Sequence, residues 1–255
     1  QNHLLKSIGR IHKYEDFVAN LKDAREVGFE NINADLIFGL PNQTIVDWQN
    51  SLKKVVELEL AHLSTYSLII EEGTLFREWL DKKKIQQIDE EIELEMYNKA
   101  IDYLTGMGYQ HYEISNFAKD AYKCKHNIGY WKNQEYLGLG VAAHSHINKK
   151  RFSNFEILED YCKSIREGKK PLENVESISI NDEISETMFL GLRMMEGISV
   201  EQFKARFDIN PKEIYGAKLK KLKDRQLINY NNTSISLTRT GIALANQVFQ
   251  EMILD

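Results

Sequence analysis

A buried strand, a helix and a second strand follow one another directly, and this order limits the folds open to the chain. NINADLIF at 31–38 is a short apolar run typical of a buried strand, and HLSTYSLII at 62–70 is another. Between them, Thr44 and Asp47 form a capping box at the start of a segment with helical spacing of its apolar residues. Strands joined through a helix pair in parallel, so the sequence predicts a βαβ unit of an α/β fold. Ligands of such sheets collect at the C-terminal ends of the strands.

The remaining elements divide the chain near the basic stretch REGKKP at 166–171. After about residue 175, three helices, a hairpin around Asn231-Asn232 and a last helix follow in the order of a winged helix. We therefore predict two domains, residues 1–171 and residues 172–255. The further helices and strands expected in the first domain are at 14–28, 88–107, 110–115 and 136–147.

The charge balance and the cysteine count argue against several classes of protein. The 255 residues carry a net charge of −5, which disfavours a nucleic-acid binder that works through bulk charge. Two cysteines do not build a disulfide framework, and no apolar run approaches the ~20 residues of a membrane-spanning helix. The chain also opens without the charged and then apolar leader of a secretion signal. We therefore expect a cytoplasmic protein.

The segment YKCKHNIGYWKNQEYLGLGVAAHSHI at 122–147 combines a cysteine, three histidines, aromatic rings and closely spaced glycines. Zinc sites use paired ligands at short spacing, and only the last two histidines fit that pattern. A haem iron needs one axial imidazole in an apolar, aromatic pocket, and His126 beside Tyr130 and Trp131 supplies these groups. A third interpretation, a polar cap on a packed aromatic cluster, is the simplest one from residue types alone.

Two other features have both a structural and a functional interpretation. Asp35 is a charge inside an apolar run, and a buried carboxylate needs either a ligand or an ordinary partner such as an arginine or backbone amides. Gly138 and Gly140 allow the backbone to approach a cofactor closely, but they also suit plain strand packing.

Four longer stretches resemble one protein family in content and in order. They are GRIHKYEDFVANLKDAREVGFENINADLIFGLPNQT, YEISNFA, HNIGYW and YLGLGVAAHS. Together they are similar to the radical S-adenosylmethionine (SAM) family of oxygen-independent coproporphyrinogen III oxidase, and in particular to the branch of the haem chaperone HemW. The resemblance implies a partial radical-SAM (β/α) barrel followed by a winged-helix-like α+β domain.

One part of the family pattern has no counterpart in this chain. The family's C-x3-C-x2-C motif carries a [4Fe–4S] cluster, whereas Cys124 and Cys162 are too far apart to form it. The glycine-rich segment that meets SAM and the first barrel strands have no match either. The resemblance therefore implies a fragment that does not cleave SAM by itself, with SAM and the cluster belonging to the complete protein.

The resemblance carries SAM-side residues over by motif. Arg10 of GRIHK and Asp35 of DLIFGLP correspond to residues at the SAM site of the family. An arginine opposite an aspartate also fits recognition of the charged groups of an amino acid. Ile69, which follows STYSL, and His144 of GVAAHS correspond to further positions on the SAM side.

The chaperone branch implies a protein that binds haem and passes it to haem-accepting respiratory proteins. Its HNxxYW pattern assigns His126 as the candidate ligand of the haem iron, with Tyr130 and Trp131 covering the macrocycle. The alternative is the oxidase, in which a 5′-deoxyadenosyl radical abstracts hydrogen from propionate side chains that then lose carbon dioxide.

The remaining expectations concern partners. A winged-helix DNA binder would rest on the basic stretch GAKLKKLKDRQ at 216–226, but the acidic total disfavours it, so we expect no nucleic acid partner. Acceptor proteins would bring peripheral membrane association. A sheet edge left open by absent barrel strands predicts self-association, with a homodimer as the simplest form.

Overall fold

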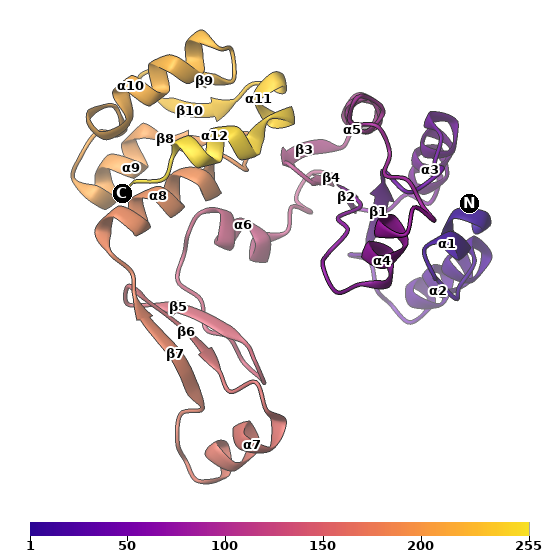
Figure 1. Ribbon diagram of the computed structural model, residues 1–255, viewed down its shortest axis with the longest axis horizontal. Helices are drawn as coiled ribbons and strands as arrows, with labels where there is room; N and C mark the ends of the chain where they lie inside the picture. Colours follow the sequence, from indigo (N-terminus) through magenta and orange to yellow (C-terminus); the bar gives the residue numbers. More distant parts are fainter. Residues whose placement is uncertain (255) are drawn as a thin grey trace. The chain divides into compact units, whose positions relative to one another are not determined.

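The computed structural model describes residues 1–254 in two compact units, which divide between Lys123 and Cys124 (Figure 1). The domain boundary predicted between residues 171 and 172 lies inside the second unit, at the start of one of its strands. The predicted boundary between two domains at this point stays a prediction.

The N-terminal unit combines five helices with a four-stranded sheet among its described residues. Its helices are α1 (Asn2–Ser7), α2 (Tyr14–Glu26), α3 (Ile45–Glu57), α4 (Leu75–Asp81) and α5 (Glu90–Gly106). Its strands are β1 (Asn33–Phe38), β2 (His62–Ser67), β3 (Gln110–Glu113) and β4 (Asn116–Ala118).

The sheet has the strand order β1-β2-β4-β3. β1 and β2 pair in parallel with Asp35 opposite Ser64, which confirms the predicted βαβ unit. β4 runs antiparallel to both β2 and β3. The short β3–β4 connection leaves no room for the crossover that a parallel β3–β4 pair would need. Among residues 1–254 this sheet is open and does not close into a barrel, with β1 and β3 at its two edges. The fold is therefore mixed α/β.

The core of this unit lies where α3 and α5 pack against the sheet. The predicted capping box is present, since Thr44 accepts a hydrogen bond from the Asp47 amide and Asp47 accepts one from the Thr44 amide. It starts α3 so that Trp48 is completely buried, and the indole Nε1 donates to the Met96 carbonyl of α5 at 2.7 Å. With one face of β1 and β2 packed on this core, the opposite face is left for polar side chains.

The C-terminal unit contains two further three-stranded sheets. The first, β5-β6-β7, is antiparallel, and the second has the order β8-β10-β9. Three helices, the β9–β10 hairpin and two short closing helices give the order that the sequence predicted, except that the last helix is divided. The elements of the first part are α6 (Lys125–Trp131), β5 (His144–Ile147), β6 (Lys150–Asn154), α7 (Leu158–Arg166) and β7 (Leu172–Ser177). Those of the second part are α8 (Ile180–Gly191), β8 (Ile198–Ser199), α9 (Val200–Phe207), α10 (Pro211–Asp224), β9 (Ile228–Tyr230), β10 (Ser234–Leu237), α11 (Arg239–Ala243) and α12 (Ala245–Glu251).

The strand expected at 136–147 is wrong for most of its length, since only its last four residues form β5. Tyr136 makes an isolated bridge to His146, and the chain between them forms a loop. Gly140 has a φ of 103° and Ala142 a φ of 57°, values that an extended strand does not allow. A side chain at Gly138 would meet the His144 carbonyl, so this glycine is required by the close approach of the loop to its own backbone.

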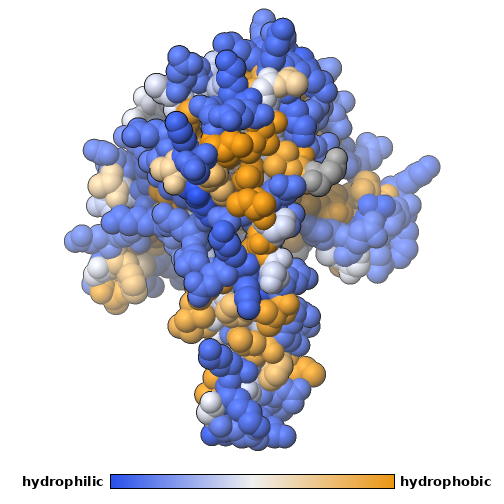
Figure 2. Space-filling view, turned by 90° about the vertical axis from the view of Figure 1, so that its left-hand side faces the viewer, coloured by the Kyte–Doolittle hydropathy of each residue, from blue (hydrophilic) through white to orange (hydrophobic). Residues whose placement is uncertain are grey.

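Apolar side chains are exposed on the part of the C-terminal unit formed by β5–β7 and α7, the narrow lower part of Figure 2. Leu158 and Ile165, seven residues apart on α7, are both more than half exposed. None of the helices in residues 1–254 has the length and apolar character needed to cross a membrane.

Candidate functional site

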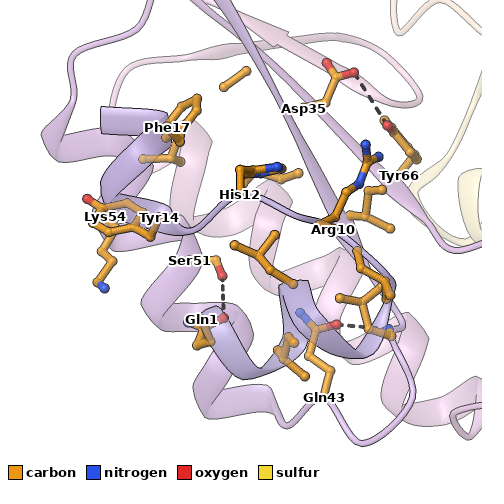
Figure 3. Close-up of a pocket in the computed structure, with 18 of the residues that line it drawn as sticks. Gln1, Arg10, His12, Tyr14, Phe17, Asp35, Gln43, Ser51, Lys54 and Tyr66 are labelled. Carbon is orange, nitrogen blue, oxygen red and sulfur yellow. Dashed lines mark hydrogen bonds between the residues drawn. The ribbon is translucent and has the colours of Figure 1, made fainter. Parts of the chain in front are cut away.

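A cavity of about 340 Å³ lies in the N-terminal unit beside β1. Apolar side chains of α1, α3 and β1 form much of its wall, and Arg10, Asp35 and Tyr66 contribute polar groups (Figure 3). The Arg10 guanidinium points toward Asp35 and Tyr66 in this view. The structure therefore brings the two predicted SAM-side residues Arg10 and Asp35 into one cavity. A cation and a carboxylate in a largely apolar wall can bind a zwitterion that carries a bulky group.

Asp35 sits in the middle of β1, with its side chain on the face away from α3 and α5. Its Oδ1 accepts a hydrogen bond from the Asn33 amide at 2.6 Å, and its Oδ2 accepts one from the Tyr66 hydroxyl at 3.5 Å. No lysine or arginine within residues 1–254 forms an ion pair with it at 4.0 Å or less. The ordinary arginine pair that the sequence left open is thus not what holds Asp35. Asp35 lines the cavity, and its Oδ2 has one long contact.

A chain of hydrogen bonds connects Asp35, through Asn33, to two buried side chains. Asn33 Oδ1 lies 2.7 Å from His62 Nδ1, and His62 Nε2 lies 2.7 Å from the Tyr112 hydroxyl. His62 and Tyr112 are 6% and 3% exposed. Burial lowers the pKa of His62 from its ordinary value, although nearby Asp35 acts in the opposite direction. His62 is therefore held neutral by its surroundings.

Tyr66 is a cavity residue that the sequence interpretation missed. Burial raises its phenol pKa from the ordinary value, Asp35 raises it further, and Arg10 opposes both effects. Its hydroxyl thus stays protonated and donates to Asp35. Alternation along β2 places Tyr66 on the same face as Ser64, but that Ser64 lies opposite Asp35 is known only from the register of the two strands.

The other two predicted SAM-side residues do not line this cavity. Ile69 follows the end of β2 and is 75% exposed. His144 begins β5 in the C-terminal unit and is exposed. Their roles stay predictions.

In the C-terminal unit, α6 carries the three residues predicted to serve haem. The His126 ring meets the Tyr130 ring edge-on, with centroids 4.8 Å apart. Tyr130 in turn meets Tyr136 at 4.7 Å, and Tyr136 lies 6.2 Å from His146. The four rings form a row that runs from exposed His126 to buried His146.

Trp131 does not belong to this row. The Arg193 guanidinium lies 4.3 Å from the centroid of its indole ring, and Trp131 lines a different cavity together with Met194 and Phe203. The structure therefore places His126 and Tyr130 together but gives Trp131 a packing contact with Arg193, which follows α8.

α6 is also fixed at its C-terminal end. Arg206 of α9 donates from Nη1 to the carbonyls of Lys132 and Asn133, and from Nε and Nη2 to Glu183 Oε1 of α8. The two residues that follow α6 are thus attached to α8 and α9 through one guanidinium.

Among residues 1–254, no three or more His, Cys, Asp or Glu side chains are arranged to hold a metal ion. Cys124 and Cys162 are not joined in a disulfide. Two separate cysteines do not fit a [4Fe–4S] cluster, which needs several thiolates from the same site.

Residues 178–244 match the family model of the HemN C-terminal domain. Over 98% of its length the chain is 36% identical to the heme chaperone HemW of Bacillus subtilis, and over 100% it is 36% identical to that of Lactococcus lactis. The chain belongs to the HemW family.

The similarity covers only part of the length of each relative. This HemW-family chain spans 66% of the length of the Bacillus subtilis and Lactococcus lactis relatives. It also resembles the solved structure of coproporphyrinogen III oxidase (HemN) from Escherichia coli, described as a radical SAM enzyme. That match has a TM-score of 0.76 at 22% identity and covers 99% of this chain and 61% of the other, so it shows a shared fold.

Proposed function

We propose that this chain serves in a haem chaperone of the HemW type, which binds haem and passes it to respiratory acceptor proteins in the cytoplasm or at the membrane surface. The observation that carries the proposal is the 36% identity to two named heme chaperones over nearly the whole chain. Haem is the cargo of such a protein.

His126 is the proposed axial ligand of the haem iron. Its imidazole is exposed on α6, and Tyr130 meets it edge-on, so a macrocycle bound there would have an aromatic side chain beside the iron ligand. Trp131 is proposed to support the site by anchoring α6 on Arg193. Its contact there favours this over covering the porphyrin.

The cavity beside β1 is the proposed SAM side of the protein. Arg10 would bind the carboxylate of the methionine part of SAM, and Asp35 Oδ2 would accept from its ammonium group. In this proposal the open sheet is the later part of a radical-SAM barrel, in line with the fold shared with HemN. SAM with a [4Fe–4S] cluster supplies a carbon radical, and the cluster ligands would come from cysteines other than Cys124 and Cys162. We assign Ile69 and His144 no direct contact.

The alternative function is radical decarboxylation of coproporphyrinogen III. It is favoured by the fold shared with HemN, but at 22% identity that similarity concerns the fold alone. The chaperone is therefore the primary proposal.

A haem titration tests the proposal. Haem added to the chain should give a Soret band of a histidine-ligated iron, and His126→Ala should shift the band and weaken binding about tenfold or more. His144→Ala, an exposed histidine on β5, and His3→Ala, an exposed histidine in the N-terminal unit, are matched controls that should leave the spectrum unchanged.

Two results would count against the assignment. An unchanged spectrum and affinity in His126→Ala would show that His126 is not the ligand. Absence of haem binding both in this chain and in the full-length natural protein would refute the chaperone proposal.

A further inference from the structure

We infer that Asn33, His62 and Tyr112 act as positioning residues for Asp35, fixing its carboxylate so that Oδ2 alone is offered to a ligand in the cavity beside β1. The inference rests on the proposed SAM role of that cavity. It concerns three side chains to which the sequence and the family resemblance assigned no function.

The first step concerns the hydrogen-bond directions in the chain. An ionised carboxylate only accepts, so the contact of 2.6 Å with Asp35 Oδ1 must be donated by the Asn33 amide nitrogen. Asn33 Oδ1 is then an acceptor, and the 2.7 Å contact requires a proton on His62 Nδ1. In neutral His62, Nε2 is consequently the acceptor of the Tyr112 hydroxyl proton, at 2.7 Å. The geometry thus selects one histidine tautomer.

The second step concerns rigidity. Asn33 and Asp35 are exposed on β1 and could rotate, but the inner end of the chain is anchored because His62 and Tyr112 are almost completely buried. The Ser64 hydroxyl adds a second donor to Asn33 Oδ1 at 3.3 Å. These contacts hold the Asn33 side chain in one orientation and, through it, the carboxylate plane of Asp35.

The third step concerns what is left for a ligand. With Oδ1 occupied by Asn33, Oδ2 has only the long 3.5 Å contact with the Tyr66 hydroxyl. It therefore keeps acceptor capacity toward the cavity, where a ligand ammonium group would form a charge-assisted hydrogen bond. Fixing the carboxylate before binding lowers the entropy lost when the ligand binds.

The test combines a tautomer measurement with an affinity measurement. The ¹⁵N spectrum of the His62 ring in this chain should show a protonated Nδ1 and an unprotonated Nε2 at neutral pH. A protonated Nε2 with a bare Nδ1 would refute the relay whatever the cavity binds.

The affinity is measured for SAM in the full-length natural protein with its cluster reconstituted. His62→Leu should weaken SAM binding about tenfold, in the range seen when an outer partner of a ligand-binding group is lost. His62→Asn, whose amide nitrogen can occupy the place of Nδ1–H, should restore much of the affinity. Tyr112→Phe should weaken binding by about threefold, since Nδ1–H remains.

Tyr109→Phe is the matched control for Tyr112→Phe. Tyr109 is equally buried, and its hydroxyl donates to the Leu60 carbonyl at 2.7 Å outside the relay. It should lower the thermal stability as Tyr112→Phe does, but leave the SAM affinity unchanged. Equal affinity losses in the two variants would mean that the Tyr112 effect is structural and would overturn the relay.

Asp35→Ala separates failure of the relay from failure of the proposed SAM site. If Asp35→Ala weakens SAM binding and a folded His62→Leu does not, the relay is wrong and the SAM site stands. If Asp35→Ala leaves the affinity unchanged, the SAM site is refuted, and the binding role of the relay with it.

Discussion

Arg206→Ala tests how α6 is held in place, because the Arg206 guanidinium joins the end of α6 to two helices. The change removes two hydrogen bonds to Glu183 and two to the backbone carbonyls at the end of α6. It leaves the Glu183 carboxylate, whose side chain is 10% exposed, with Lys149 at 3.8 Å as its remaining ion pair. Losing one partner of a largely buried pair costs about 3 kcal/mol, so we expect the free energy of unfolding of the C-terminal unit to fall by that amount.

Urea unfolding measures this loss, and far-ultraviolet circular dichroism and tryptophan fluorescence should follow the same transition for the C-terminal unit. Lys221→Ala is the matched control, since the Lys221–Glu251 pair has a comparable distance of 2.7 Å but an exposed lysine. Its cost should stay below about 1 kcal/mol. Arg206→Ala should also weaken haem binding, because α6 carries His126.

The double variant Arg206→Ala, Glu183→Gln refines the interpretation. Neutralising the Glu183 carboxylate should recover part of the lost stability. If Arg206→Ala lowers the free energy of unfolding no more than Lys221→Ala does, the Arg206 guanidinium does not hold α6 in place.

Three further predictions follow from the N-terminal unit. Burial lowers the pKa of His62 in the native state from its ordinary value of 6.5. Between that value and the lowered native pKa, the unfolded state binds more protons than the native state. The free energy of unfolding should therefore decrease as the pH falls through this range. Nearby Asp35 opposes this effect, and His62→Asn should remove the decrease in urea titrations. The edge of β1 and exposed Ile11, Val27 and Phe29 should promote self-association; a monodisperse monomer in light scattering would contradict this. Without cluster ligands, the chain alone should bind SAM weakly or not at all, and micromolar affinity by calorimetry would count against the proposed cofactor geometry.

The local parts of the fold could be predicted from the sequence because their signals lie within a few residues. The Thr44–Asp47 box starts α3, and the hairpin at Asn231-Asn232 joins β9 to β10. The parallel β1–β2 pair followed from the length of its connection. Each of these depends on spacing along the chain alone.

The parts that were missed depend on register and on tertiary contacts. Tyr66 and the His62 relay become visible only once β1 and β2 are aligned, since Asn33 pairs with His62 and lies far from it in sequence. The loop at 136–143 was expected to be a strand because many of its residues are apolar. The positive φ values at Gly140 and Ala142, which a strand does not allow, cannot be read from that pattern. The stacking of Arg193 on Trp131 joins residues 62 positions apart and had no local signal.

Transfer of haem is the measurement that tests the central proposal most directly. The full-length natural protein, loaded with one equivalent of haem, is mixed with the haem-free form of a respiratory haem protein, and the Soret band of each is followed after separation. We expect the acceptor to gain haem at the expense of the donor, and His126→Ala neither to load haem nor to deliver it. Haem that stays on the donor, or delivery that is undiminished in His126→Ala, would contradict the proposed chaperone function.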